Sequence, residues 1–137
     1  MFVGTSILDG YDTVLQEETT MRDHKKLKAF QLADVLALKV YKATAHFPKE
    51  EQYGLKAQLR KSAVSTPSNI VEGCARNTEA DYLRFLDIAF GSSRELEYQV
   101  SLAFRLGYLG QDVYKELEGD SVETSKVIGG LIRSLRR

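Results

Sequence analysis

The sequence is poor in the residues that cross-link or interrupt a chain. It contains one cysteine (Cys74), two prolines (Pro48 and Pro67) and no tryptophan in 137 residues. A single cysteine excludes an intrachain disulfide, and we expect a reducing, cytoplasmic environment. Because prolines are so few in a chain rich in Leu, Ala, Glu, Lys and Arg, the composition favours an all-helical protein.

The chain also lacks long hydrophobic runs and an excess of either charge. No stretch of about eighteen apolar residues occurs, so we expect no membrane span. Residues 1–15 lack the basic and apolar regions of a signal peptide. Lys plus Arg and Asp plus Glu both number 19, which gives a formal net charge of zero. Since a non-specific nucleic-acid binder normally has a basic excess, any basic surface here must come from an uneven distribution of charge.

The ionisable residues match no pattern of a metal site or an enzyme. His24 and His46 are far apart, and no Glu-x-x-His pair of the di-iron type occurs. Gly129 and Gly130 lack the following Lys and Ser or Thr of a phosphate-binding loop. No nucleophile stands at usable spacing from a base. We therefore expect a non-enzymatic protein without metal or cofactor.

Apolar residues recur at the spacing of amphipathic helices in four segments, approximately residues 29–47, 49–76, 79–106 and 111–136. Pro48 ends the first, because proline disfavours helical geometry in the residue before it. Thr78 and Asp81 resemble a capping box at the start of the third, and Gly107 is suited to end it. Short loops join antiparallel neighbours, so the predicted fold is an all-α, up-down-up-down four-helix bundle.

Two residues interrupt the predicted helices. Pro67 lies inside the second helix, where it should remove one backbone hydrogen bond and kink the axis. The apolar face stays in phase across Pro67, so one kinked helix is favoured over two helices broken at Ser65 or Thr66. Gly119 weakens the fourth helix, where a break is the alternative.

The start of the chain differs from the rest. Residues 1–20 show no apolar period, and helical patterning follows them at once. We divide the chain into an N-terminal extension, residues 1–27, and a four-helix bundle domain, residues 28–137. The extension is expected to be flexible, with an arm that packs on a neighbouring subunit as the alternative.

Small polar residues on the buried face of the second helix are the most unusual feature of the pattern. Each would cost about 1–3 kcal/mol if buried unpaired, so they should bond one another or the carbonyl freed by Pro67. We interpret them as a structural network rather than a ligand or catalytic site built on Asn69 and Glu72. The predicted polar core consists of Ser62, Ser65, Asn69, Glu72, Gly73 and Gln99.

Basic residues show some order on two helices. Four on the fourth helix fall along one line opposite its apolar stripe, and three cluster on the second helix. One interpretation is that these residues form an ordinary solvated helix face, since acidic residues neighbour the line. The alternative is a surface that follows phosphates and is repeated around an oligomer. The candidate nucleic-acid-binding residues are Lys56, Arg60, Lys61, Lys115, Lys126, Arg133 and Arg137.

Large apolar residues also lie outside the main apolar stripes. A monomeric bundle needs one apolar face per helix, so a surplus on several helices indicates a second buried surface. We therefore expect self-association. The surplus residues are Val35, Leu38, Val64, Val71, Leu83, Phe90, Tyr98 and Leu102.

Four motifs follow one another in a characteristic order. They are Phe47-Pro48-x-x-Glu51-x-Tyr53-Gly54-Leu55-x-x-Gln58-Leu59-Arg60, Ser65-x-Pro67-x-Asn69-Ile70-x-Glu72-Gly73, Phe85-Leu86-x-Ile88-Ala89-x-Gly91-Ser92-x-x-Glu95-Leu96 and Leu131-Ile132-x-Ser134-Leu135. This succession, over residues 30–135, resembles the bacterial four-helix bundle family of 23S rRNA-intervening-sequence proteins, also called S23 ribosomal proteins. The chain departs from that family in its extension and at Thr66, where isoleucine is common.

The resemblance implies a homo-oligomer whose biochemical role is undefined. Family members are encoded within insertions in 23S rRNA genes or as free-standing genes, so the name records genomic location. Related proteins are the accessory variability determinant of diversity-generating retroelements, in which a barrel of five subunits binds nucleic acid and reverse transcriptase. A homopentamer that binds RNA or a nucleic-acid-handling protein through basic residues is therefore favoured. A protein-interaction scaffold without nucleic-acid contact is the alternative.

Overall fold

Helices make up almost all of the part of the chain that the computed structural model describes, residues 22–137. No strand occurs in this part, and none of its helices is long and apolar enough to cross a membrane. Two short 3₁₀ turns, η2 (His24–Lys26) and η3 (Lys49–Glu51), accompany the helices. The four long helices are α2 (Lys28–Thr44), α3 (Leu55–Cys74), α4 (Glu79–Arg105) and α5 (Gln111–Leu135).

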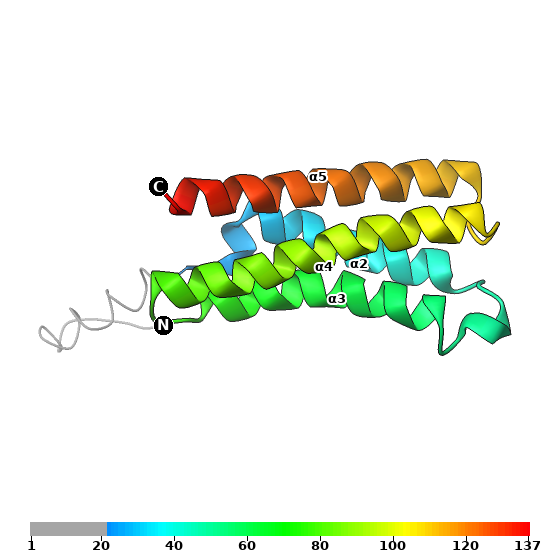
Figure 1. Cartoon of the computed structure of the whole chain (residues 1–137), viewed down its shortest axis with the longest axis horizontal. Helices are drawn as coiled ribbons and strands as arrows, with labels where there is room; N and C mark the ends of the chain where they lie inside the picture. The colour runs from blue at the N-terminus through cyan, green and yellow to red at the C-terminus, as the bar shows by residue number, and fades with distance from the viewer. Residues whose placement is uncertain (1–21) are drawn as a thin grey trace, which may run out of the picture.

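The four helices form a closed ring of neighbours. Each packs against the next along the chain, and α5 packs against α2. Consecutive helices run in opposite directions (Figure 1). Within residues 22–137, the backbones of the diagonal pairs, α2 with α4 and α3 with α5, do not approach each other as closely as those of neighbouring helices do. The all-α, up-down-up-down four-helix bundle predicted from the sequence is confirmed.

The ends of α4 follow the sequence signals. The hydroxyl of Thr78 accepts a hydrogen bond from the N–H of Asp81 at 3.1 Å, which satisfies a free amide at the start of the helix. Gly107 has a φ of 86°, in the left-handed region that glycine adopts without strain. The chain can therefore turn directly into the loop before α5.

The second predicted helix begins later than its sequence pattern indicated. Residues 49–51 form η3, and Gly54 breaks the helical path with φ −111° and ψ −119°. Glu51 stabilises this break, because its Oε1 accepts from the N–H of Leu55 at 2.8 Å and its Oε2 from the hydroxyl of Tyr108 at 2.9 Å. These two bonds lower the pKa of Glu51. The prediction of one helix from residue 49 was therefore wrong.

The two expected weak points do not break the helices. α3 runs through Pro67 and α5 runs through Gly119. Beside the proline, the hydroxyl of Thr66 donates to the carbonyl of Ser62 at 3.0 Å, and the amide of Asn69 donates to that of Ser65 at 2.8 Å. The alternatives of two shorter helices in place of α3 and of a break at Gly119 were wrong. The kink at Pro67 stays a prediction.

The interior contains two apolar clusters with buried hydroxyl groups between them. One cluster lies toward the α4–α5 loop and includes Leu36, Val40, Leu59, Leu96 and Val100. The other lies toward the opposite end and includes Ile70, Leu86, Ala89, Ile128 and Ile132. At the boundary, α3, α4 and α5 bury Ser62, Thr66, Ser93, Ser121, Thr124 and Ser125.

The described part of the predicted extension packs on the bundle. η2 contacts both α2 and α3. The guanidinium of Arg22 donates to the carbonyl of Arg76 at 3.3 Å and lies 4.0 Å from the ring centroid of Tyr82. Residues 1–21, the rest of the extension predicted to be flexible, lie outside the described residues.

Candidate nucleic-acid interface on the α4–α5 face

The chain is formally neutral as a whole, but its helical bundle carries a net positive charge. All nineteen Lys and Arg residues lie within residues 22–137, together with fifteen of the nineteen Asp and Glu residues. This part therefore has a net charge of +4, and the other four acidic residues are Asp9, Asp12, Glu17 and Glu18. Sequence reasoning missed the division because charge was counted over the whole chain. Whole-chain neutrality is thus no argument against a basic surface on the bundle.

Charge is also divided along α5. Residues 111–123 contain five acidic residues and only Lys115 as a base. Residues 124–137 contain no acidic residue and four bases, Lys126, Arg133, Arg136 and Arg137. Because a helix rises about 1.5 Å per residue, this basic segment covers roughly 20 Å of the surface. That length matches several successive phosphates of a nucleic acid.

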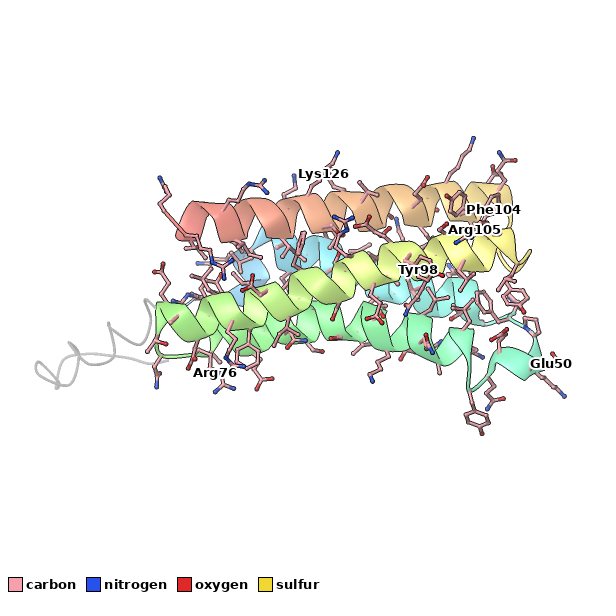
Figure 2. The ribbon with its side chains drawn as sticks, in the orientation of Figure 1. Glu50, Arg76, Tyr98, Phe104, Arg105 and Lys126 are labelled. Atoms are coloured by element: carbon pink, nitrogen blue, oxygen red, sulfur yellow. The ribbon has the colours of Figure 1, made fainter. Side chains whose placement is uncertain are left out.

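Three predicted binding residues on α5 and a fourth just after its end are all exposed: Lys115, Lys126, Arg133 and Arg137. Figure 2 shows Lys126 projecting outward from α5, away from the other helices. Among residues 22–137, none of the four forms an ion pair with a carboxylate. Their positive charges are therefore available to an external anion.

The acidic neighbours of this line have partners elsewhere. Lys39 on α2 pairs with Glu116 and Asp120, both at 2.7 Å, and this pairing raises the pKa of Lys39. Glu118 accepts a hydrogen bond from the hydroxyl of Tyr114 at 2.9 Å. Three of the carboxylates beside the line thus have partners within the chain, and the one lysine among these partners offsets one of their three negative charges.

The three predicted residues on α3 do not join the α5 line, since α3 and α5 lie diagonally opposite each other in the ring of helices. Lys61 is exposed and Lys56 is half-buried. The guanidinium of Arg60 is held inside the α2–α3 contact, where it donates to the hydroxyl of Thr44 at 2.9 Å. These positions give the α3 residues no shared surface with the α5 residues.

A groove between α4 and α5 adds a residue that the sequence analysis missed. It encloses about 290 Å³ and is lined by Phe90, Arg94, Glu97, Val122, Ser125, Lys126, Gly129 and Arg133. Arg94 comes from α4 and lines the groove together with Lys126 and Arg133 of α5. No local pattern singles out Arg94, because its place depends on how α4 and α5 pack.

A chain of polar contacts connects the buried hydroxyl layer to this groove. The hydroxyls of Ser93 and Ser125 lie 2.7 Å apart, and Ser125 also donates to the carboxylate of Glu97. Nε of Arg94 lies 3.4 Å from that carboxylate. Glu97 therefore orients Arg94, and its own negative charge is offset by these two partners.

The comparisons with known proteins concern the fold and the family. The family model for the 23S rRNA-intervening sequence protein matches residues 25–130. The chain belongs to this family. A solved structure is also similar, with a TM-score of 0.69, 24% identity, and coverage of 76% of this chain and 97% of the other. It is a protein of unknown function from the S23 ribosomal protein family of Bacteroides thetaiotaomicron VPI-5482.

A search of curated proteins found no match. The resemblance stated from the motifs is thus confirmed at the level of family and fold. The matched region includes Arg94 and Lys126 but ends before Arg133 and Arg137. The most basic end of α5 therefore lies beyond the region that matches the family model.

The predicted polar core of this family member requires one correction. Glu72 is exposed and pairs with Arg76 one turn later at 2.7 Å, so it does not belong to the core. Ser65 links α3 to α4, since its hydroxyl lies 2.9 Å from that of Ser92 and accepts from the amide of Asn69 at 3.0 Å. The other predicted members, Ser62, Gly73 and Gln99, are buried.

Two further observations concern binding chemistry in this core and its surroundings. Oε1 of Gln99 is buried without a hydrogen-bond partner among residues 22–137. In the same part of the chain, no group of three or more His, Cys, Asp and Glu residues is placed to hold a metal ion. Among the described residues, no metal centre therefore competes with the cations of the α4–α5 face.

Proposed function

We propose that this protein is a non-catalytic, homo-oligomeric bundle that binds RNA or a nucleoprotein partner through phosphate contacts on its α4–α5 face. One observation carries the proposal: Arg94, Lys126 and Arg133 from two helices border a single groove. Cations concentrated in this way attract a phosphate backbone, because their binding releases counterions into solution. The acid-free segment of α5, residues 124–137, extends the same surface.

The proposed self-association is supported by apolar side chains that the single chain leaves exposed. Leu38 exposes 69% of its surface, Tyr98 59% and Val35 49%. The surplus is smaller than the sequence indicated, since Leu83, Phe90 and Leu102 pack partly against the core clusters. A homopentamer, favoured by the family resemblance, would repeat the basic face around the assembly. Repetition strengthens binding because neighbouring sites act on one ligand.

A protein-interaction scaffold without nucleic-acid contact is the second candidate. It is favoured by the same exposed residues on α2, Val35 and Leu38, which lie one turn apart and suit an apolar partner surface. The two functions place their binding energy on different faces. Changing the α4–α5 cations should therefore affect only the first.

The experiment compares two double charge reversals in the full chain. Lys126→Glu with Arg133→Glu should lower the affinity for a structured RNA at least tenfold at low salt. It should also reduce the slope of log affinity against log salt concentration by about two, because each cation that binds a phosphate contributes roughly one to that slope. Lys42→Glu with Lys49→Glu changes net charge equally at exposed positions away from the groove, and should have a much smaller effect.

Fluorescence anisotropy over a range of salt concentrations measures both quantities. If the unmodified protein binds neither structured nor single-stranded RNA at low salt, the nucleic-acid function is wrong. If both double variants lose the same affinity, binding depends on total charge and the α4–α5 face is not the site.

A further inference from the structure

Gly129 shapes the floor of the α4–α5 groove. A Cβ atom added at this position would lie 3.3 Å from Cε1 of Phe90 and 3.4 Å from Nη1 of Arg133. The contact with Phe90 is closer than ordinary van der Waals packing, so a larger residue would press on the aromatic ring, while the guanidinium lies at ordinary contact distance. The missing side chain therefore lets an aromatic edge and a cation lie side by side at the surface of α5.

Phe90 gives this groove a chemical character that a simple basic patch lacks. The ring is half-buried, packs against one apolar core cluster and still lines the groove. Arg94, Lys126 and Arg133 line the same groove, together with one carboxylate, that of Glu97. An aromatic surface beside cations matches the two parts of a nucleotide, since a base stacks on a ring while its phosphate pairs with the cations.

The size of the groove limits what it can hold. Its volume of about 290 Å³ lies at the lower end of small-ligand pockets, which measure about 300–1,000 Å³. In a duplex the bases are stacked on each other and cannot reach a protein ring, whereas unpaired bases can be turned outward. The combination therefore suits one unpaired nucleotide rather than a double helix.

We propose that the α4–α5 groove binds one unpaired nucleotide of an RNA strand, with the base against Phe90 and the flanking phosphates against Arg94, Lys126 and Arg133. This inference rests on the proposed RNA-binding function and specifies its ligand as single-stranded. Glu97, held by Ser125, keeps Arg94 at the groove wall. Arg137, which is exposed and follows the end of α5, extends the cationic surface on one side.

The test compares two glycine substitutions on the same helix. Gly129→Ala crowds the groove, whereas a Cβ at Gly119 would meet no atom within 4 Å. Both changes favour the helix, because alanine has the higher helix propensity. Loss of binding in Gly129→Ala therefore cannot be attributed to a weakened α5.

Affinities are measured by anisotropy with an unstructured single-stranded RNA and with a fully paired RNA duplex of equal length. The unmodified protein should bind the single strand more tightly. Gly129→Ala should lower its affinity for the single strand at least fivefold and change duplex affinity less than twofold. Gly119→Ala should leave both affinities unchanged.

Phe90→Leu provides a second, independent variant. Leucine keeps the apolar contact with the core but removes the stacking ring, so the single-strand affinity should fall while the duplex affinity stays the same. Circular dichroism melts check that each variant is folded at the temperature of the binding measurement. If Gly129→Ala is destabilised, Phe90→Leu decides the result.

The outcomes separate this inference from the proposed function. If Gly129→Ala and Phe90→Leu bind both RNAs as the unmodified protein does, while the α5 charge reversal abolishes binding, the nucleotide site is wrong and RNA binding stands. If these two variants lose equal affinity for the single strand and the duplex, the groove acts only as a cationic surface. That result also overturns the inference. If the charge reversal has no effect, both proposals fail.

Discussion

The guanidinium of Arg60 donates a hydrogen bond to the hydroxyl of Thr44 at 2.9 Å, so it joins α3 to α2. The same group donates to the carbonyl of Tyr41 at 3.1 Å and lies 4.3 Å from the centroid of its ring. Thr44 is buried and uses its own hydroxyl proton on the carbonyl of Val40. These contacts favour a structural role for a residue that the sequence analysis grouped with nucleic-acid contacts.

Arg60→Ala should therefore destabilise the bundle without weakening RNA binding. We expect a loss of about 1–2 kcal/mol in the free energy of unfolding, from the hydrogen bonds and the cation–π contact. Urea denaturation measures the stability, and anisotropy on the folded variant measures affinity. Lys61→Ala, an exposed change one residue later, should leave stability nearly unaltered. A tenfold loss of RNA affinity in folded Arg60→Ala would contradict the structural role.

Gly73→Ala should destabilise the contact between α3 and α4. A Cβ there would lie 3.0 Å from Cβ of Phe85 and 3.3 Å from the backbone carbonyl oxygen of Tyr82. These rigid neighbours cannot move as a flexible side-chain end can, so the helices must separate. Overpacking costs about 1–3 kcal/mol, which outweighs a helix-propensity gain of up to about 1 kcal/mol. Thermal melts should place Gly73→Ala below the unmodified protein and Gly119→Ala at or above it.

Tyr82 should make stability fall in strongly alkaline solution. Burial raises its pKa to about 12, because the charged phenolate would lose its hydration, whereas the pKa in the unfolded chain is about 10. The folded state therefore keeps a proton that the unfolded state releases. The resulting stabilisation is complete below about pH 10 and is lost as the pH rises toward 12.

The Tyr82→Phe variant isolates this effect, since phenylalanine cannot ionise. Urea midpoints measured from pH 9 to 12 should decline more steeply for the unmodified protein than for the variant. Subtracting the midpoints of the variant from those of the unmodified protein cancels the contributions of other tyrosines. These include Tyr108 and Tyr114, whose pKa values are raised by hydrogen bonds to carboxylates. Parallel declines in the two proteins would show that Tyr82 titrates normally.

Leu38→Glu should reduce self-association. Leu38 exposes 69% of its surface on α2, and a charge there would make its burial against another copy costly. Light scattering at micromolar concentration should show a smaller mass than for the unmodified protein. Gln31→Glu adds the same charge at an exposed position on the same helix and should leave the mass unchanged. A compact monomer in the unmodified protein would remove the basis for the oligomer.

The sequence alone determined four features of the fold. They are the helix pattern, the capped start of α4, the left-handed glycine after α4 and the antiparallel order of the helices. Each depends on residues within a few positions of one another: the spacing of apolar side chains, the Thr78–Asp81 pair, Gly107 and the short loops. The family resemblance also rests on the order of motifs along the chain. Local interactions suffice for these features, so they could be predicted.

The break before α3 and the roles of individual cations were decided only by the tertiary structure. Glu51 accepts from the N–H of Leu55 at the start of α3, and Tyr108 reaches the same carboxylate from the loop after α4. Arg60 is held by α2. Lys126 points away from the other helices, and Arg94 of α4 lines the same groove as Lys126. These differences follow from how the helices are rotated and aligned against one another. Partners on another helix leave no periodic trace in the sequence, so the pattern locates charges without showing which of them remain available.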